Sequence, residues 1–354
     1  MSALIPVLPV HRFDEDRLRA YLADRIPGLG GIAVRQFQGG QSNPTFRLDT
    51  GAGSFVLRKK PPGPLLPSAH QVEREYRVIA ALHGSAVPVP RAILLCEDPD
   101  IIGTAFYVMD CVDGRILERP ELEGHTPADR SAVYDAMNTT LAALHSVDWA
   151  AAGLGGFGRT EHYLTRQIDR WTRQYRASVV GEADPVMEEL IVWLTANTPA
   201  DARITIAHGD FRLGNLLFAP EAPRVAAVLD WELSTLGDPL GDLAYCCLPY
   251  HLPAEMDGVK GLRGIDLAAL GIPTEDEFVA AYCRRTGRDG IASWTFYLTF
   301  SLFRLAAILQ GVHARAVQGN ASNSNALEVG RRATLLARTA QGLALGPLAL
   351  GQGH

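Results

Sequence analysis

Three oxygen-bearing side chains in one region of the sequence have the types and spacing for chemistry on a phosphate. Residues 208–215 have the sequence HGDFRLGN, which places Asp210 five residues before Asn215, and Asp230 follows fifteen residues later at the end of an apolar run. An Asp and an Asn five residues apart can share one loop, and an Asp at the end of a nearby strand can face the same metal ion. The spacing therefore indicates a phosphoryl-transfer centre.

Each of these side chains has an expected role. Asp210 would accept or orient the proton of a substrate hydroxyl, and Arg212 could place its charge on the transferring phosphoryl group. Asn215 and Asp230 would hold Mg²⁺, which prefers oxygen ligands and bridges phosphates. His208 is expected to support the loop by hydrogen bonds rather than to act as a base.

A glycine turn near the N-terminus is the first candidate for a nucleotide site. Residues 32–48 are expected to form two short strands around the turn GGQSNP at 39–44. Gly40 would let backbone amides approach phosphates, and Ser42 and Asn43 would add side-chain donors. A plain hairpin turn has the same pattern, so both interpretations stay open.

A β-rich run, SFVLRKK at 54–60, ends in three cations before two prolines stop it. One cation at the end of a buried strand can hold ATP phosphates if an acidic partner fixes it. The apolar spacing after residue 71 predicts a helix with Glu75 near its inward face. We predict an ion pair between Arg58 and Glu75, with a solvated strand end as the alternative.

A strand expected at 105–109 runs into a glycine-containing connector, DCVDG, at 110–114. Such a connector can serve as a hinge between lobes. Its backbone at Met109 and Cys111 could hold an adenine ring, which needs edge hydrogen bonds and apolar faces. An ordinary edge strand and turn would look the same.

The rest of the chain is mainly helical in pattern. The predicted helices span 127–145, 185–194, 275–285, 293–312 and 325–345, and short strands are expected at 203–207, 216–218 and 224–229. These strands flank the HGDFRLGN motif. Asp210 and Asp230 are therefore expected on a loop and at a strand end.

Composition excludes some classes of protein. A chain of 354 residues exceeds what one core usually holds, which predicts two lobes. A net charge of -6 gives no support to nucleic-acid binding. Five cysteines without a CxxC pair, and no signal-peptide pattern at the start, favour a reduced cytoplasmic chain. The adjacent Cys246 and Cys247 are expected as buried thiols rather than zinc ligands.

The most apolar segment, 294–309, contains Arg304. It falls short of the ~20 residues that a membrane span needs. We therefore expect a buried core helix here and no membrane segment.

The motifs resemble those of the aminoglycoside phosphotransferase and choline kinase-like superfamily, a branch of the protein-kinase-like fold. The HGD sequence with Asn215 and Asp230 looks like that superfamily's catalytic loop and metal aspartate. Longer stretches at 39–46, 56–63 and 229–239 are similar to the kinase domain fused to certain acyl-CoA dehydrogenases, which also occurs alone in bacteria. The resemblance covers residues from about 30 to about 340.

This resemblance implies an α+β, protein-kinase-like two-lobed fold with ATP in the cleft. Residues 1–110 would form an N-lobe of antiparallel sheet plus a helix, and residues 111–354 a mainly helical C-lobe. It also implies that Asp210 is the catalytic aspartate, that Asn215 and Asp230 are the metal ligands, and that Glu75 is the glutamate of the ion pair.

The sequence departs from the family pattern at two places. Many relatives have lysine where Arg58 stands, so any of the cations at 58–60 could contact the phosphates. Trp231 and Glu232 follow Asp230 in place of Phe-Gly. The second departure is usual in the small-molecule branch and argues against a protein kinase regulated by movement of that segment.

One helical stretch offers a clue to the substrate. The arginines at 166, 170, 173 and 176 fall on one helical face, with Trp171 beside it. If this helix covers the cleft, as the corresponding segment tends to in the superfamily, it would attract an anion and repel a polycationic aminoglycoside. A solvated basic face is the alternative. The candidate substrate contacts are Arg166, Arg170, Trp171 and Glu232.

The sequence thus predicts an ATP- and Mg²⁺-dependent phosphotransferase that acts on a hydroxyl of a small molecule. Our hypothesis for the acceptor is a hydroxylated acid or its CoA thioester. An aminoglycoside, sugar or choline-type kinase is the alternative in the same class. A nucleotide-binding pseudokinase is the alternative from another class, and the intact set of Asp210, Asn215 and Asp230 argues against it. Oligomeric state is not predicted.

Overall fold

The computed structural model describes residues 3–38, 43–63, 70–200, 203–254, 260–317 and 326–346, with the side chains of 326–331 left aside. Proximity of Cα atoms divides the chain into two compact units. The first comprises Met1–Glu118, Val147–Phe157 and Leu213–Ser234, and the second comprises Arg119–Ser146, Gly158–Arg212 and Thr235–His354. The chain crosses between the units several times, so they do not correspond to a single cut at 110/111, and that lobe boundary stays a prediction.

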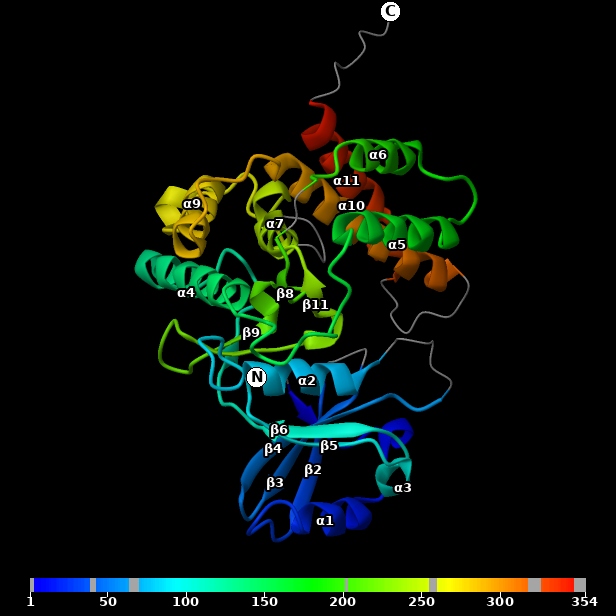
Figure 1. Ribbon diagram of the computed structural model, residues 1–354, viewed down its shortest axis with the longest axis vertical. Coiled ribbons are helices and arrows are strands. Elements are labelled where there is room, and N and C mark those ends of the chain that lie inside the picture. Colours follow the sequence, from blue (N-terminus) through cyan, green and yellow to red (C-terminus); the bar gives the residue numbers. More distant parts are fainter. Residues whose placement is uncertain are drawn as a thin grey trace, which may run out of the picture. The chain divides into compact units, whose positions relative to one another are not determined.

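A six-stranded antiparallel sheet is the centre of the first unit (Figure 1). The strand order is β1-β2-β3-β4-β6-β5. The strands are β1 (Leu4–Ile5), β2 (Ile32–Phe37), β3 (Thr45–Thr50), β4 (Gly53–Lys59), β5 (Ala92–Cys96) and β6 (Phe106–Asp110). The short helices and turns around them are η1 (Pro9–His11), α1 (Glu15–Ala23), α2 (Val72–Leu82) and α3 (Pro99–Ile102). The predicted strands on either side of the glycine turn are confirmed, while residues 39–42 lie outside the described residues.

The two faces of this sheet carry different side chains, because successive residues of a strand point to opposite sides. Phe55 and Leu57 of β4 belong to a hydrophobic core that includes the buried leucines of α1. The alternate residues Val56 and Arg58, together with Tyr107 of β6, line a cavity instead. The α2 helix packs against β5 and β6. One face of the sheet is thus the core, and the other presents the site.

The two predicted metal ligands flank strands of a second, three-stranded antiparallel sheet in the first unit. It has the order β10-β9-β7, formed by β7 (Arg115–Ile116), β9 (Leu216–Phe218) and β10 (Val225–Val228). The 3₁₀ turns η2 (Leu213–Asn215) and η3 (Trp231–Leu233) lie at the ends of β9 and β10. The amide of Leu229 donates to the carbonyl of Asn215 at 2.9 Å. The backbones that precede β9 and follow β10 are therefore held side by side.

The second unit is mainly helical. Its helices are α4 (Pro127–His145), α5 (Tyr163–Ala177), α6 (Pro185–Ala196), α7 (Pro239–His251), α8 (Leu267–Leu270), α9 (Glu275–Thr286), α10 (Trp294–Val317) and α11 (Ala326–Leu345). A two-stranded antiparallel sheet pairs β8 (Thr205–Ala207) with β11 (Thr235–Gly237). The predicted α+β class, with an antiparallel sheet in one part and helices in the other, is confirmed.

The α10 helix is longer than its apolar sequence predicts. It runs for 24 residues and, by length and composition alone, is apolar enough to cross a membrane. However, 61% of its most apolar window is buried inside the protein, and eight consecutive residues from Phe296 to Phe303 are buried. Burial on every side is typical of a core helix. The helix was expected over 293–312, and it extends five residues beyond that end, to Val317.

Candidate active site

A cavity of about 240 Å³ lies entirely within residues of the first unit. Five residues predicted to act on nucleotide or metal line it, namely Arg58, Met109, Cys111, Asn215 and Asp230. Apolar side chains form much of its wall, namely Val56, Ile79, Val112, Ile116, Leu217 and Val228. An apolar cavity with a few polar groups at one place is typical of a small-ligand site.

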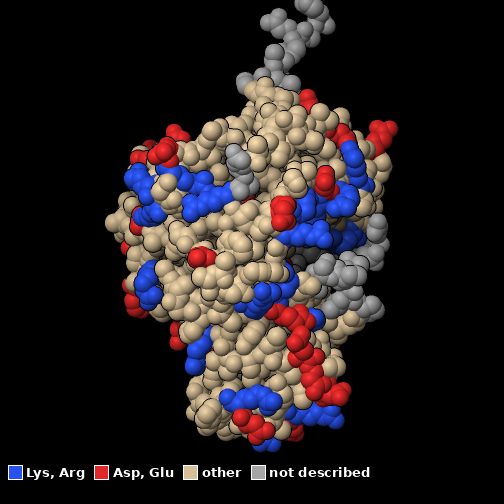
Figure 2. Space-filling view, viewed as in Figure 1, with Lys and Arg blue, Asp and Glu red and all other residues tan. Residues whose placement is uncertain are grey.

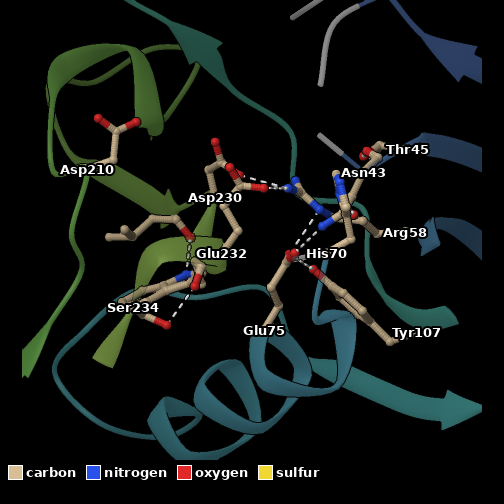
Figure 3. Close-up of polar contacts among 12 residues, drawn as sticks. Asn43, Thr45, Arg58, His70, Glu75, Tyr107, Asp210, Asp230, Glu232 and Ser234 are labelled. Atoms are coloured by element: carbon tan, nitrogen blue, oxygen red, sulfur yellow. Dashed lines mark hydrogen bonds and ion pairs between the residues drawn. The ribbon is translucent and has the colours of Figure 1, made fainter. Parts of the chain in front are cut away.

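Arg58 is the centre of the polar contacts in this cavity (Figure 3). Its Nε lies 2.9 Å from Oε2 of Glu75, and its Nη2 donates to Oδ1 of Asp230 at 2.8 Å. The predicted Arg58–Glu75 ion pair is thus confirmed. Burial would lower the pKa of Arg58, but the negative charges of Glu75 and Asp230 outweigh it and raise that pKa. The guanidinium is therefore firmly charged and held by carboxylates on both sides.

The neighbouring cations face elsewhere. Lys59 is only 3% exposed and its ammonium lies 5.9 Å from the ring centre of Phe13, and burial lowers its pKa. Lys60 forms an ion pair with Glu73. Of the three cations in the run, Arg58 is the one that lines the cavity. The geometry thus favours Arg58 for a phosphate contact, which the sequence left open.

Glu75 lies in a buried network that fixes its carboxylate. Asn43 Nδ2 donates to its Oε1 at 2.6 Å, and the hydroxyl of Tyr107 donates to its Oε2 at 3.0 Å. Nδ1 of His70 lies 3.1 Å from Oδ1 of Asn43. Burial raises the pKa of Glu75 to about 7, against the opposing effect of Arg58.

This network revises the role expected of Asn43. We predicted it as a phosphate donor, but its side chain is fully buried and its amide is used by Glu75 and His70. It supports the ion pair instead. Tyr107 and His70 were not predicted, because an aromatic residue in a strand and a lone histidine give no pattern. Gly40 and Ser42 lie outside the described residues.

Asn215 and Asp230 fit a magnesium ion by their chemistry. Both line the cavity, and both offer the oxygen donors that Mg²⁺ prefers. Asp230 has a φ of 65°, a left-handed conformation that is uncommon for a residue with a side chain and is often found at functional sites. No cluster of three or more His, Cys, Asp and Glu side chains occurs in the described ranges. An ion here would complete its shell with phosphate and water oxygens, as Mg²⁺ usually does.

Met109 and Cys111 line the cavity at the end of β6. The amide of Cys111 already donates to the carbonyl of Ser54 at 3.2 Å. An adenine ring would have to replace this bond to use that amide. The expected adenine contact of this backbone therefore stays a prediction.

The loop that carries Asp210 belongs to the second unit and is fixed by a buried carboxylate. The amides of His208 and Gly209 donate to Asp242 at 2.5 and 2.8 Å. The amide of Asp210 in turn donates to Nδ1 of His208 at 3.2 Å. His208 is fully buried, and its ring and amide form hydrogen bonds within this loop and to Asp242, as a supporting role requires. The loop thus presents Asp210 from a rigid base.

The carboxylate of Asp210 has two side-chain neighbours, the exposed Arg212 and the partly buried Tyr245. Nε of Arg212 donates to its Oδ2 at 3.3 Å, and the Arg212 side chain is 53% exposed. Burial raises the pKa of Tyr245 in α7, and the charge of Asp210 and a hydrogen bond with it add to this rise. Arg304 of α10 donates to the carbonyl of Gly209. Tyr245 and Arg304 were missed because each lies within an apolar helical run.

The four arginines of α5 are not equivalent, although basic side chains gather over this helix in Figure 2. Arg166 donates to the carbonyl of Arg159 at 2.6 Å, and Arg173 donates to a carbonyl of its own helix. Arg176 forms an ion pair with Glu188 at 2.6 Å. Arg170 instead lies over the ring of Trp171, a side chain that is only 5% exposed.

Glu232 is part of the first unit, and its Oε2 lies 3.7 Å from Nη2 of Arg58. Its expected contact with the substrate stays a prediction.

The sequence of residues 33–297 matches the model of the phosphotransferase enzyme family. The chain belongs to this family. A protein from Ralstonia eutropha, provisionally named an aminoglycoside phosphotransferase, has a solved structure with a TM-score of 0.86 and 46% identity to this chain, covering 94% of this chain and 98% of that one. The aminoglycoside phosphotransferase APH(4)-Ia, solved with ADP and hygromycin B, shares the fold at 16% identity and a TM-score of 0.59, covering 91% of this chain and 98% of that one. The protein-kinase-like fold that the motifs imply is thereby confirmed.

The curated relatives that the chain matches are longer proteins. Mouse acyl-CoA dehydrogenase family member 10 is 47% identical over 337 residues, which cover 95% of this chain and 31% of the relative. The chain therefore spans about a third of that protein's length. The similarity confirms the resemblance to the kinase-like domain found with acyl-CoA dehydrogenases.

Proposed function

We propose that this protein is an ATP- and Mg²⁺-dependent phosphotransferase whose acceptor is a hydroxyl of a small molecule. The observation that supports the proposal best is the cavity that Arg58, Asn215 and Asp230 line together. The chain's membership of the phosphotransferase family supports the same reaction. A fold relative was solved with ADP, which supports an adenine nucleotide as the donor.

The residues have complementary tasks in this reaction. Arg58, fixed by Glu75, would bind phosphate oxygens, and Asn215 and Asp230 would hold the metal. Magnesium, when bound, bridges the phosphates and neutralises their charge. Asp210 would take or orient the proton of the acceptor hydroxyl as its oxygen attacks the γ-phosphorus. Arg212, beside Asp210, would offset the charge of the group in transfer.

For the acceptor we propose a hydroxylated acid or its CoA thioester. Two observations support this class. The longer relatives are named as acyl-CoA dehydrogenase family members, and the exposed face of α5 is rich in arginine. A polycationic aminoglycoside would be repelled by such a face. The Ralstonia protein's name keeps an aminoglycoside kinase as the second candidate.

A substrate panel tests the proposal. ADP release would be measured with hydroxy acids, their CoA thioesters, aminoglycosides, choline and sugars, each with and without Mg²⁺. We expect turnover with the acids or thioesters only. Turnover of aminoglycosides or choline but not of the acids would overturn the acceptor class. Nucleotide binding without any turnover would favour a pseudokinase.

A further inference from the structure

Two arginines of the second unit share one aromatic ring. The guanidinium carbon of Arg170, on α5, lies 5.4 Å from the ring centre of Trp171, and that of Arg304, on α10, lies 5.1 Å from it. The α5 and α10 helices pack against each other, so this arrangement brings together charges that are 134 positions apart in the sequence.

Among the described residues, neither cation has a carboxylate partner. In the part of the chain that the structure describes, no ion pair joins Arg170 or Arg304 to an Asp or Glu, whereas Arg176 on the same helix is paired with Glu188. Nε of Arg304 is buried without a hydrogen-bond partner, and so is Nε1 of Trp171. Buried donors of this kind are normally satisfied. Arg170 itself is exposed, so its guanidinium can be reached from solvent.

The same cluster reaches the loop of the proposed catalytic base. Arg304 donates to the carbonyl of Gly209, the residue before Asp210. Its guanidinium carbon also lies 5.5 Å from the ring centre of Tyr245, which hydrogen-bonds with Asp210. An anion held by Arg304 would thus lie beside the residue that is proposed to receive the acceptor's proton.

We propose that Arg170 and Arg304 bind an anionic oxygen group of the acceptor, a carboxylate or a phosphate, and so restrict the reaction to anionic hydroxyl compounds. This inference rests on the proposed function and adds two specificity-determining residues to it. A guanidinium binds such groups through paired, charge-assisted hydrogen bonds. Burial lowers the pKa of Arg170, and the nearby charge of Arg304 lowers it further, so a bound anion would also relieve this repulsion.

Matched acceptors and matched variants test the inference. A hydroxy acid, its uncharged amide and its CoA thioester would be assayed with the wild type, Arg170→Gln and Arg173→Gln. A charge-assisted hydrogen bond is worth about 1.5–3 kcal/mol, so we expect Arg170→Gln to raise KM for the anionic acceptor roughly 10- to 100-fold, with kcat nearly unchanged. The amide should be unaffected. Arg173→Gln should behave as the wild type, because Arg173 bonds to its own helix.

The acceptors also separate the two sources of the anion. If Arg170→Gln raises KM only for the free acid, the anion bound at this site is the acceptor's carboxylate. If it raises KM only for the thioester, the bound anion is a phosphate of CoA. Equal losses of kcat/KM for the acid and the amide would overturn the inference. A second variant, Arg304→Gln, should raise the same KM but also lower kcat through the Gly209 contact, with its thermal midpoint measured to confirm folding.

Failure of the proposed function gives a different result from failure of this inference. If the wild type phosphorylates no hydroxyl compound, the proposed function fails. In that case, quenching of tryptophan fluorescence by hydroxy acids or CoA would test the site directly. Quenching that is lost in Arg170→Gln but kept in Arg173→Gln would support the anion site, and no quenching in the wild type would overturn it.

Discussion

At the scale of single residues, Asp210 combines a rigid backbone with a carboxylate beside one cation and one tyrosine. The amides of His208 and Gly209 are fixed by Asp242, so a change at the Asp210 side chain need not disturb the loop. Asparagine has nearly the same shape but cannot take a proton at neutral pH. Asp210 therefore allows a substitution that separates chemistry from structure.

We predict that Asp210→Asn lowers kcat by about 10²- to 10⁴-fold, the usual contribution of a general base. Nucleotide affinity should stay within a few-fold, because the cavity is formed by other residues. Steady-state ADP release and calorimetric titration with ATP would measure the two effects. Asp289→Asn, a change at an exposed residue, is the control. An unaltered rate in Asp210→Asn would mean that another residue takes the proton.

A second residue-scale prediction concerns Glu75 and pH. Burial raises its pKa from 4.5 to about 7, so the folded state holds more protons than the unfolded state between these values. The contribution of Glu75 to the free energy of unfolding is therefore fully present below pH 4.5 and is lost as the pH rises through about 7. We expect Glu75→Gln to flatten this fall in the free energy of unfolding. Urea denaturation from pH 5 to 8 measures it, with Glu73→Gln as the control on the same helix. If the free energy of unfolding falls with pH equally in Glu75→Gln and the wild type, the raised pKa of Glu75 is contradicted.

The residues also show how far sequence reasoning reaches. The Arg58–Glu75 pair was predictable, because a cation at a strand end and an acid on the following helix are close in sequence. Arg304 was not, because its neighbours Trp171 and Gly209 come from distant segments that only tertiary packing brings together.

At the scale of elements, helix starts were the most predictable features. Thr126 and Asp129 form a capping box before α4, and Thr274 and Glu277 form another before α9, as local side-chain hydrogen bonds allow. The end of α10, at Val317, was not predictable from local sequence, because α10 packs extensively against α11. Local chemistry sets where a helix begins, while tertiary contacts decide how far it extends.

The connector between β6 and β7 gives a prediction at this scale. A Cβ at Gly114 would lie 2.5 Å from the carbonyl oxygen of Phe218 and 2.6 Å from Cγ of Leu217, closer than atoms can pack. We predict that Gly114→Ala lowers the free energy of unfolding by about 1–3 kcal/mol, the usual cost of overpacking. Chemical denaturation measures it. Gly156→Ala, which has open space around it, should change stability little. If both variants change the free energy of unfolding equally, β7 and β9 can move apart to admit the Cβ with little loss of stability.

At the scale of the whole molecule, the first unit is assembled from segments that are far apart in the sequence. Residues Leu213–Ser234 join the N-terminal sheet unit, although they follow more than 50 residues of the second unit. No composition change marks this return, because both units have apolar strands of similar length. The candidate site residues were therefore predicted by motif, while the grouping of Asn215 and Asp230 with Arg58 required the structure.

That grouping predicts that this chain binds nucleotide without the additional length of its curated relatives, since residues 1–118 and 213–234 supply every lining residue of the cavity. A ligand at 100 times its Kd adds about 2.7 kcal/mol to stability. Saturating ATP analogue with Mg²⁺ should raise Tm and slow amide exchange in 107–112, 214–217 and 228–231, but not in α9. Thermal scans and hydrogen-exchange mass spectrometry measure both effects. Arg58→Gln should weaken this protection far more than Lys60→Gln, whose side chain lies outside the cavity lining. Protection of α9 alone, or equal effects of the two variants, would place the nucleotide elsewhere.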